Sequence, residues 1–171
     1  MDAPDPALDP ALADTPAARA LAGSTLRHEL RPSGSPRSVE EAAAFQGVPV
    51  ASILRTIVVR RATDDYLFVL VPGGRRIAWP RLRSLLGINR MTLPDADEAK
   101  AATGYERGTI TPFGATRDWP IVADATLRGA GRVVLGGGRR GVTLHVDADE
   151  LLAYTAATVA DISDPAEPGE D

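Results

Sequence analysis

The sequence predicts a mixed α+β domain, and two patterns carry this prediction. Runs of β-branched and apolar residues between turn residues indicate strands, whereas apolar repeats between capping residues and glycines indicate helices. These segments do not alternate strictly, which favours α+β over a parallel α/β fold. The 171 residues are 44% hydrophobic and 25% charged, which suits one core. We therefore expect one folded domain over 15–162, a disordered acidic tail over 1–14 and an acidic tail over 163–171.

The first helix signal is Thr15 followed by Pro16, a pair typical of a helix start. We expect this short helix to reach Ala22 and to end at Gly23, because glycine is common directly after a helix. Residues 24–30 are then expected to form a strand.

A capping box marks the next helix, because Ser38 is followed three residues later by Glu41. Gly47 is expected to end this helix. The apolar, β-branched runs at 53–60 and 66–71 predict two strands joined as a hairpin.

Two further helices precede a glycine-containing segment. Residues 78–86 predict one helix, which stops at Gly87, because its leucines repeat at helical spacing. Residues 94–102 predict another, capped near Thr92 or Leu93.

The last third of the chain predicts a short strand, a hairpin and a final helix. The strand is expected at 121–123, and the hairpin pairs 132–135 with 141–146 across three glycines. Asp147 is the expected cap of a helix over 149–155.

The segment between Thr103 and Gly114 reads TGYERGTITPFG and has no apolar period. Gly108 permits a positive φ and lets a ligand approach the main chain, while Pro112 stiffens the exit. Such a loop can direct several amides at one point, where they bind a carboxylate, a phosphate or a developing oxyanion. An ordinary surface connection is the alternative that this spacing leaves open.

Composition narrows the possible chemistry. The chain has no cysteine, and His28 and His145 are its only histidines, so we expect no disulfide, no metal and no cofactor. No apolar run approaches the ~18 residues that a membrane span requires. The acidic N-terminal residues do not resemble a signal peptide, so we expect a cytoplasmic protein without a membrane partner.

The net charge of −4 conceals a basic centre. Nine of the 23 acidic residues lie in the segments 1–22 and 161–171, so residues 23–160 hold 14 acidic and 18 basic side chains. A basic centre is compatible with a nucleic-acid or phosphate ligand. A solvated charged surface is the alternative.

Six motifs follow one another along the chain: EEAAAFQGV, ILRTIVV, RLRSLLGI, TGYERGTITPFG, VVLGGGRRGVTLHV and VADI. Their order resembles the YbaK/EbsC family of aminoacyl-tRNA deacylases, which is related to the editing domain of bacterial prolyl-tRNA synthetases. The resemblance covers roughly residues 26–162. Its most specific part is the glycine loop followed by GGRRG.

The resemblance implies a barrel-like mixed sheet with surrounding helices. It also implies a trans-editing hydrolase that cleaves the ester between an amino acid and the 3′ end of tRNA, without a metal or cofactor. The partner implied is the acceptor end of aminoacyl-tRNA, and an aminoacyl-tRNA synthetase is a further candidate partner. Amides from Gly108 to Thr111 would stabilise the oxyanion, and a water and the substrate's own ribose hydroxyl would act in place of a side-chain nucleophile.

The matching positions give two sets of site residues. The expected catalytic set is Arg55, Gly108, Thr109 and Thr111. The expected substrate-binding set is Thr56, Tyr105, Pro112, Phe113, Gly136, Gly137, Thr143 and His145.

Three positions depart from the family pattern. Arg55 stands where the family has lysine; it keeps the charge and binds phosphate, but it does not give up a proton near neutral pH. Gly136 replaces a small hydroxyl residue and Thr143 replaces an acidic one, so the amino-acid specificity of relatives does not transfer. These departures support an alternative, a weak or inactive module that binds tRNA acceptor ends or a related small ligand.

The roles of three side chains stay open at this point. Tyr105 and Phe113 either contact the substrate or anchor the loop. By strand alternation His145 shares a face with Thr143, but the sequence does not say which face meets the pocket.

Overall fold

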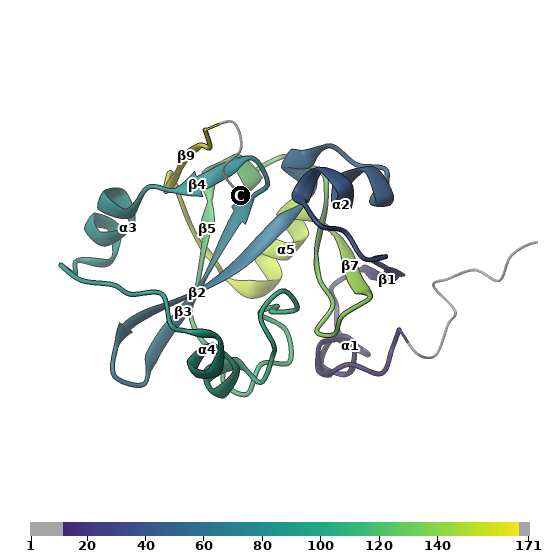
Figure 1. The fold of residues 1–171 in the computed structure, drawn as a ribbon, viewed down its shortest axis with the longest axis horizontal. Helices are drawn as coiled ribbons and strands as arrows, with labels where there is room; N and C mark the ends of the chain where they lie inside the picture. The colour runs from purple at the N-terminus through teal and green to yellow at the C-terminus, as the bar shows by residue number, and fades with distance from the viewer. Residues whose placement is uncertain (1–11, 168–171) are drawn as a thin grey trace, which may run out of the picture.

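Two antiparallel hairpins form the framework of the computed structural model, which describes residues 12–167 (Figure 1). The first hairpin pairs β2 (Leu54–Ala62) with β3 (Asp65–Pro72). The second pairs β6 (Arg132–Gly136) with β7 (Val142–Asp147). Both hairpins confirm the sequence prediction, because apolar runs flank short connections in each.

The two hairpins belong to different sheets. β7 also pairs with β1 (His28–Pro32), giving the order β1-β7-β6. β3 pairs in parallel with β5 (Ile121–Asp124), and β5 pairs in parallel with β8 (Thr158–Ala160), giving β2-β3-β5-β8. A third sheet consists of β4 (Arg75–Ile77) and β9 (Ser163–Pro165). The predicted α+β class is confirmed.

One isolated parallel bridge, between Ile53 and Val134, joins the two larger sheets. Away from this bridge the sheets separate, so the strands within residues 12–167 do not form one closed hydrogen-bonded ring. The mixed sheet with surrounding helices agrees with the expected fold class, and its two larger sheets meet at one seam.

The helices are α1 (Pro16–Leu21), α2 (Val39–Gln46), α3 (Trp79–Leu86), α4 (Ala96–Thr103) and α5 (Ala148–Thr155), with short 3-10 turns η2 (Val50–Ser52) and η3 (Ala125–Leu127). Four of the helices lie around the periphery of these sheets, whereas α5 lies near the centre and packs against both larger sheets (Figure 1). Thr15, Ser38 and Asp147 each accept a hydrogen bond from an amide three residues later, at 3.0 to 3.1 Å. These three predicted caps are therefore confirmed.

Two predicted boundaries were wrong. Pairing begins at His28 rather than at residue 24, because Leu26 turns into the core, where it is 4% exposed. The cap of α4 is Asp95, whose Oδ1 accepts from the amide of Glu98 at 2.8 Å. Thr92 cannot cap this helix, because its amide and carbonyl pair with those of Arg60.

The three-residue strands β4, β8 and β9 were missed, because a segment so short shows no apolar period. β9 begins at Ser163, so the start of the expected acidic C-terminal tail pairs with β4 instead. Residues 1–11 and 168–171, which include most of both expected tails, lie outside the described residues.

Alternation along the second hairpin builds the main core. Val133 and Leu135 of β6 and Leu144 and Val146 of β7 are buried together against Leu151 of α5. Burial of each such side chain stabilises the fold by roughly 1.5–3 kcal/mol. The opposite face of this hairpin contributes to the candidate site described below.

The glycine loop is fixed against α1 at its end. Gly114 has φ +68°, and a Cβ there would lie 2.4 Å from the carbonyl oxygen of Pro16 and 2.8 Å from the nitrogen of Ala17. Only glycine allows this backbone to approach the first turn of α1 so closely.

We predict that Gly114→Ala destabilises the protein more than Gly129→Ala. Gly129 has a similar φ of +70° but open space around a would-be Cβ, so its substitution carries only the positive-φ penalty of about 1–2 kcal/mol. The clash with α1 adds about 1–3 kcal/mol at position 114. Urea unfolding of both variants measures the difference; equal losses of unfolding free energy would contradict the close contact.

Candidate functional site

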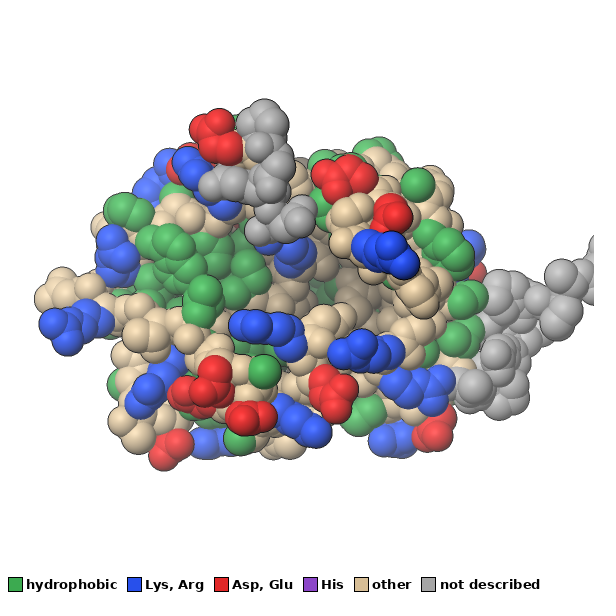
Figure 2. All heavy atoms as spheres, in the orientation of Figure 1, with side chains coloured by type: hydrophobic (Ala, Val, Ile, Leu, Met, Phe, Trp, Pro, Cys, Tyr) green, Lys and Arg blue, Asp and Glu red, His purple; other side chains and the backbone are tan. Residues whose placement is uncertain are grey.

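A cavity of about 940 Å³ opens where the two larger sheets separate. Ile53 and Leu54 line one side of the seam, and Val134 and Leu135 of β6 line the other. Residues 33–36 and α2 form a further wall. Figure 2 shows the hollow near the centre of the molecule, with basic side chains around it.

Arg55 and Gly108 both line this cavity, although they come from β2 and from the glycine loop. The structure thus brings together the two groups that the sequence analysis placed at the centre of catalysis. Thr56, Gly136 and Thr143 line the same cavity.

Arg55 is held in place by the third sheet. Its Nη2 donates a hydrogen bond to the carbonyl oxygen of Arg75 in β4. The Arg75 side chain in turn donates to Ser163 of β9, from Nε to Oγ at 2.7 Å and from Nη2 to the carbonyl at 3.0 Å. The position of Arg55 therefore depends on β4 and β9, two strands that sequence reasoning missed.

Asp124 stabilises the contacts between Arg55, Arg75 and Ser163. Its carboxylate is 1% exposed, lies 3.8 Å from Nε of Arg75 and accepts from the amide of Ile162 at 3.2 Å. Burial alone would raise the pKa of Asp124, but hydrogen bonds from Thr126 and Ser163 and from backbone amides hold it below its usual value. The carboxylate therefore stays charged and holds Arg75, the first residue of β4, in place.

The glycine loop offers fewer amides than expected. The Thr109 amide donates to the carbonyl of Glu106 at 3.0 Å, and the Thr109 hydroxyl donates to the same oxygen at 2.7 Å. Within the described part of the chain, the amides of Gly108 and Ile110 donate to no protein acceptor. These two amides, rather than that of Thr109, are the candidates for an oxyanion site.

Tyr105 and Phe113 anchor the loop and do not line the cavity. The Tyr105 hydroxyl donates to the carbonyl of Phe113, and the two side chains are 2% and 6% exposed. Burial raises the pKa of Tyr105 to about 12, so it is a neutral donor. Thr111 is fully buried and, like Pro112, does not line the cavity.

Gly136 has a packing role as well as a place in the cavity wall. A Cβ at this position would lie 3.1 Å from the carbonyl oxygen of Ile110 and 3.2 Å from that of Thr109. The neighbouring Gly137 does not line the cavity; its Cβ would lie 2.6 Å from Cγ1 of Val142. Both glycines therefore allow close backbone contact, and that of Gly136 positions the loop.

His145 lies behind the cavity wall rather than in it. Its Nε2 is 2.7 Å from Oε1 of Gln46, whose Nε2 donates to the carbonyl of Pro32 at 3.0 Å. This second bond orients the Gln46 amide, so His145 Nε2 carries a proton and donates it. Thr143, on the same strand face, lines the cavity, as does Gln46.

Burial, together with the charges of Arg31 and Arg132 and against that of Glu29, lowers the pKa of His145 to about 4. The ring is therefore neutral at pH 7 and supports Gln46 as a fixed hydrogen-bonding group. Sequence reasoning missed Gln46, which appears in the pattern only as the last residue of a helix.

The cavity is cationic. Four arginines line it and no aspartate or glutamate does so among the described residues: Arg55, Arg107, Arg139 and Arg140. Only Arg55 of these was predicted as a site residue. Thr56 lines the cavity, and its buried Oγ1 has no hydrogen-bond partner among the described residues.

Neither a metal centre nor a membrane span stands out in the part of the chain that the structure describes. Residues 12–167 contain no cluster of three or more side chains suited to hold a metal ion. No helix in that range combines the length and apolar character needed to cross a bilayer.

This arrangement suits an anionic ligand and a reaction that develops negative charge on oxygen. The lining contains no cysteine, histidine or carboxylate in the described residues, so no side chain there is placed as a nucleophile with its base. Amides and guanidinium groups can stabilise an oxyanion and orient phosphate.

Comparisons with known proteins agree with this picture. The family model for the aminoacyl-tRNA editing domain matches residues 35–154. A proline–tRNA ligase from Thermosipho africanus is 29% identical over 75% of this chain and 23% of its own length. The chain spans about a fifth of the length of such ligases.

Two relatives are similar in size to this chain. EbsC from Enterococcus faecalis, described as a candidate Cys-tRNA(Pro)/Cys-tRNA(Cys) deacylase, is 21% identical over 74% of this chain and 77% of its own length. A crystal structure of a candidate trans-editing enzyme for prolyl-tRNA synthetase is 27% identical, with a TM-score of 0.77 over 87% of this chain and 95% of that chain.

We predict that, as the pH falls below 7, the free energy of unfolding decreases less in His145→Gln than in the wild type. The unfolded chain protonates this histidine near pH 6.5, whereas the folded chain does so only near pH 4. The neutral ring thus stabilises the fold fully above pH 6.5, and this contribution of at most about 3 kcal/mol is lost as the pH falls towards 4. Urea unfolding at several pH values tests this; an unchanged slope in the variant would refute it.

Proposed function

The chain belongs to the aminoacyl-tRNA editing domain family, and we propose that it is a trans-editing hydrolase that removes a wrongly attached amino acid from the 3′ end of tRNA. The observation that carries this proposal is the presence of Arg55 and Gly108 on one cationic cavity without a side-chain base. The acceptor end of aminoacyl-tRNA would be the substrate, and the cytoplasm the place of action.

In this proposal the ester carbonyl lies at the glycine loop. The amides of Gly108 and Ile110 stabilise the oxyanion that forms when water adds to the carbonyl carbon, an interaction typically worth about 10²–10³ in rate per donor. The bond to the ribose oxygen then breaks, that oxygen takes a proton, and the amino acid leaves. A ribose hydroxyl of the substrate serves to orient the water.

Arg55 acts by charge and position. Its guanidinium cannot transfer a proton near neutral pH, so its role is to orient the ester or hold the phosphate beside it. The bond from Nη2 to the carbonyl of Arg75 holds the guanidinium in a fixed direction. The arginine at this position is therefore compatible with hydrolysis, and the deacylase is favoured over a module that only binds.

Selection among amino acids would occur at the far side of the cavity. Thr143 and Gln46 provide polar groups there, and Val134 and Val142 provide apolar ones. One methylene group changes binding by only about 1–3 kcal/mol, which is why hydrolysis in a second site improves accuracy. A synthetase that hands over the mischarged tRNA would be a second partner in this proposal.

We predict that Arg55→Ala lowers kcat/KM for deacylation of mischarged tRNA by about 10²-fold or more, whereas Arg55→Lys keeps activity within about tenfold. The measurement is release of labelled amino acid from a panel of mischarged tRNAs. Arg61→Ala is the matched control, because Arg61 is on the same strand and pairs with Asp65 outside the cavity. Binding without turnover on every tRNA would contradict the hydrolase.

We predict that tRNA binding depends strongly on salt and that Arg139 and Arg140 contribute to this dependence. Replacing both with alanine should weaken binding and reduce the slope of log K against log salt by about one for each phosphate that is no longer neutralised. Titrations at several ionic strengths measure the slope. Arg128 lies outside the cavity, so Arg128→Ala should leave the slope unchanged. If Arg128→Ala and the double alanine variant change the slope equally, binding at this cavity is contradicted.

A further inference from the structure

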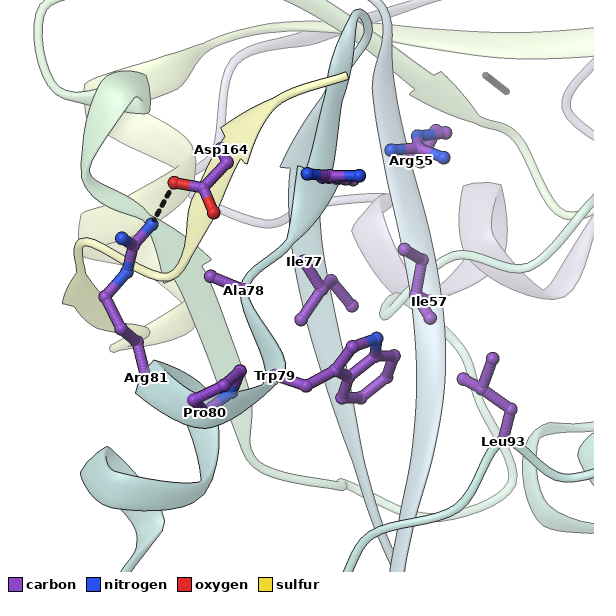
Figure 3. Close-up of a pocket in the computed structure, with 10 residues that line it drawn as sticks. Arg55, Ile57, Ile77, Ala78, Trp79, Pro80, Arg81, Leu93 and Asp164 are labelled. Carbon is purple, nitrogen blue, oxygen red and sulfur yellow. Dashed lines mark hydrogen bonds and ion pairs between the residues drawn. The ribbon is translucent and has the colours of Figure 1, made fainter. Parts of the chain in front are cut away.

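A second hollow of about 590 Å³ lies beside the cavity, on the other side of Arg55 (Figure 3). Arg55, Ile57 and Leu93 line both hollows, so the two adjoin along these three residues. The second hollow plays no part in the deacylation described above.

An indole ring forms the floor of this hollow. Trp79, the first residue of α3, extends past Ile77 towards Ile57 and Leu93 (Figure 3). Trp79 is half-buried against the core beneath α3, so its ring is held in place while one part stays accessible. Leu93, at the edge of both hollows, is 57% exposed.

The surroundings of the indole ring are basic. Arg55, Arg76 and Arg81 line the hollow, and Asp164 is the single acidic residue in its described lining. The charge of Arg81 is compensated by Asp164 at 2.8 Å and Asp161 at 3.4 Å. Figure 2 shows the hydrophobic area left of centre, with basic side chains at its border and the central hollow beside it. An accessible aromatic ring with arginines around it is the arrangement by which proteins bind single-stranded nucleic acid.

We propose that this hollow binds the nucleotide directly upstream of the terminal adenosine of tRNA, with its base stacked on Trp79. The inference rests on the proposed function, because the cavity would hold the aminoacyl-adenosine. The strand must then leave the cavity across Arg55 and Leu93, and the next base meets the Trp79 ring. Arg55, which borders both hollows, would lie beside the phosphate between the two nucleotides.

The test compares two substrates in the same protein. Trp79→Leu keeps an apolar side chain at the start of α3 but removes the stacking surface. We expect it to raise KM for mischarged tRNA by roughly 5- to 150-fold and to leave KM and kcat for aminoacyl-adenosine unchanged. Trp79→Phe, which retains a smaller ring, should lie between the wild type and Trp79→Leu. Thermal unfolding checks that both variants fold.

Two outcomes would overturn the proposal: equal KM values for mischarged tRNA in Trp79→Leu and the wild type, or an equal loss on both substrates, which would make Trp79 part of the cavity itself. Failure of the proposed function is distinguishable, because the wild type would then hydrolyse neither substrate.

A second readout does not need turnover. An uncharged RNA oligonucleotide ending in CCA should quench tryptophan fluorescence more in the wild type than in Trp79→Leu, which retains Trp119. It should also bind Trp79→Leu more weakly by anisotropy. An oligonucleotide of the same length whose penultimate nucleotide lacks a base should abolish this difference. If Trp79→Leu instead impairs only binding of a synthetase, the hollow is a protein-binding surface and the proposal is wrong.

Discussion

The contact between the glycine loop and Gly136 is the constraint on which the candidate site depends. The loop carbonyls at residues 109 and 110 lie where a Cβ of residue 136 would have almost no room. Because β6 has no side chain there, the loop reaches the seam between the two sheets and places Gly108 in the same cavity as Arg55. A larger residue would move the loop by a few tenths of an ångström or more, and oxyanion stabilisation is sensitive to shifts of that size.

The charge distribution follows from the same architecture. The carboxylates that fix the scaffold, such as Asp124, lie under the third sheet, whereas the described lining of the cavity carries arginines alone among charged residues. Acidic groups therefore stabilise the position of Arg55 without placing a carboxylate on the described cavity wall that a phosphate or oxyanion would meet. A buried carboxylate is expensive unless it is paired and hydrogen-bonded, and the contacts of Asp124 with Arg75, Thr126 and Ile162 meet that requirement.

Much of the fold was predictable from local chemistry, but less of the site was. The hairpins and the caps at Thr15, Ser38 and Asp147 depend on residues close in sequence, and the motif order pointed to Arg55 and Gly108. Which other residues line the cavity depends on where the sheets separate, a feature fixed by the distant pair Ile53 and Val134. For that reason sequence reasoning missed Gln46 and the arginines at 107, 139 and 140. Tyr105 and Phe113 have side chains that suit either a ligand contact or a loop anchor, and in the structure they anchor the loop.

The arginine at position 55 is also consistent with its place between two hollows. An ammonium group has three donors around one point, whereas a guanidinium has five in a planar fork that spans a wider area. Arg55 donates from Nη2 to the carbonyl of Arg75 and borders both the cavity and the Trp79 hollow. A side chain at this junction must be fixed by the scaffold and must also contact a strand that passes between the two hollows. A planar guanidinium fork suits both requirements better than a point charge does. The departure from lysine therefore fits a positioning role at the junction and does not by itself argue against catalysis.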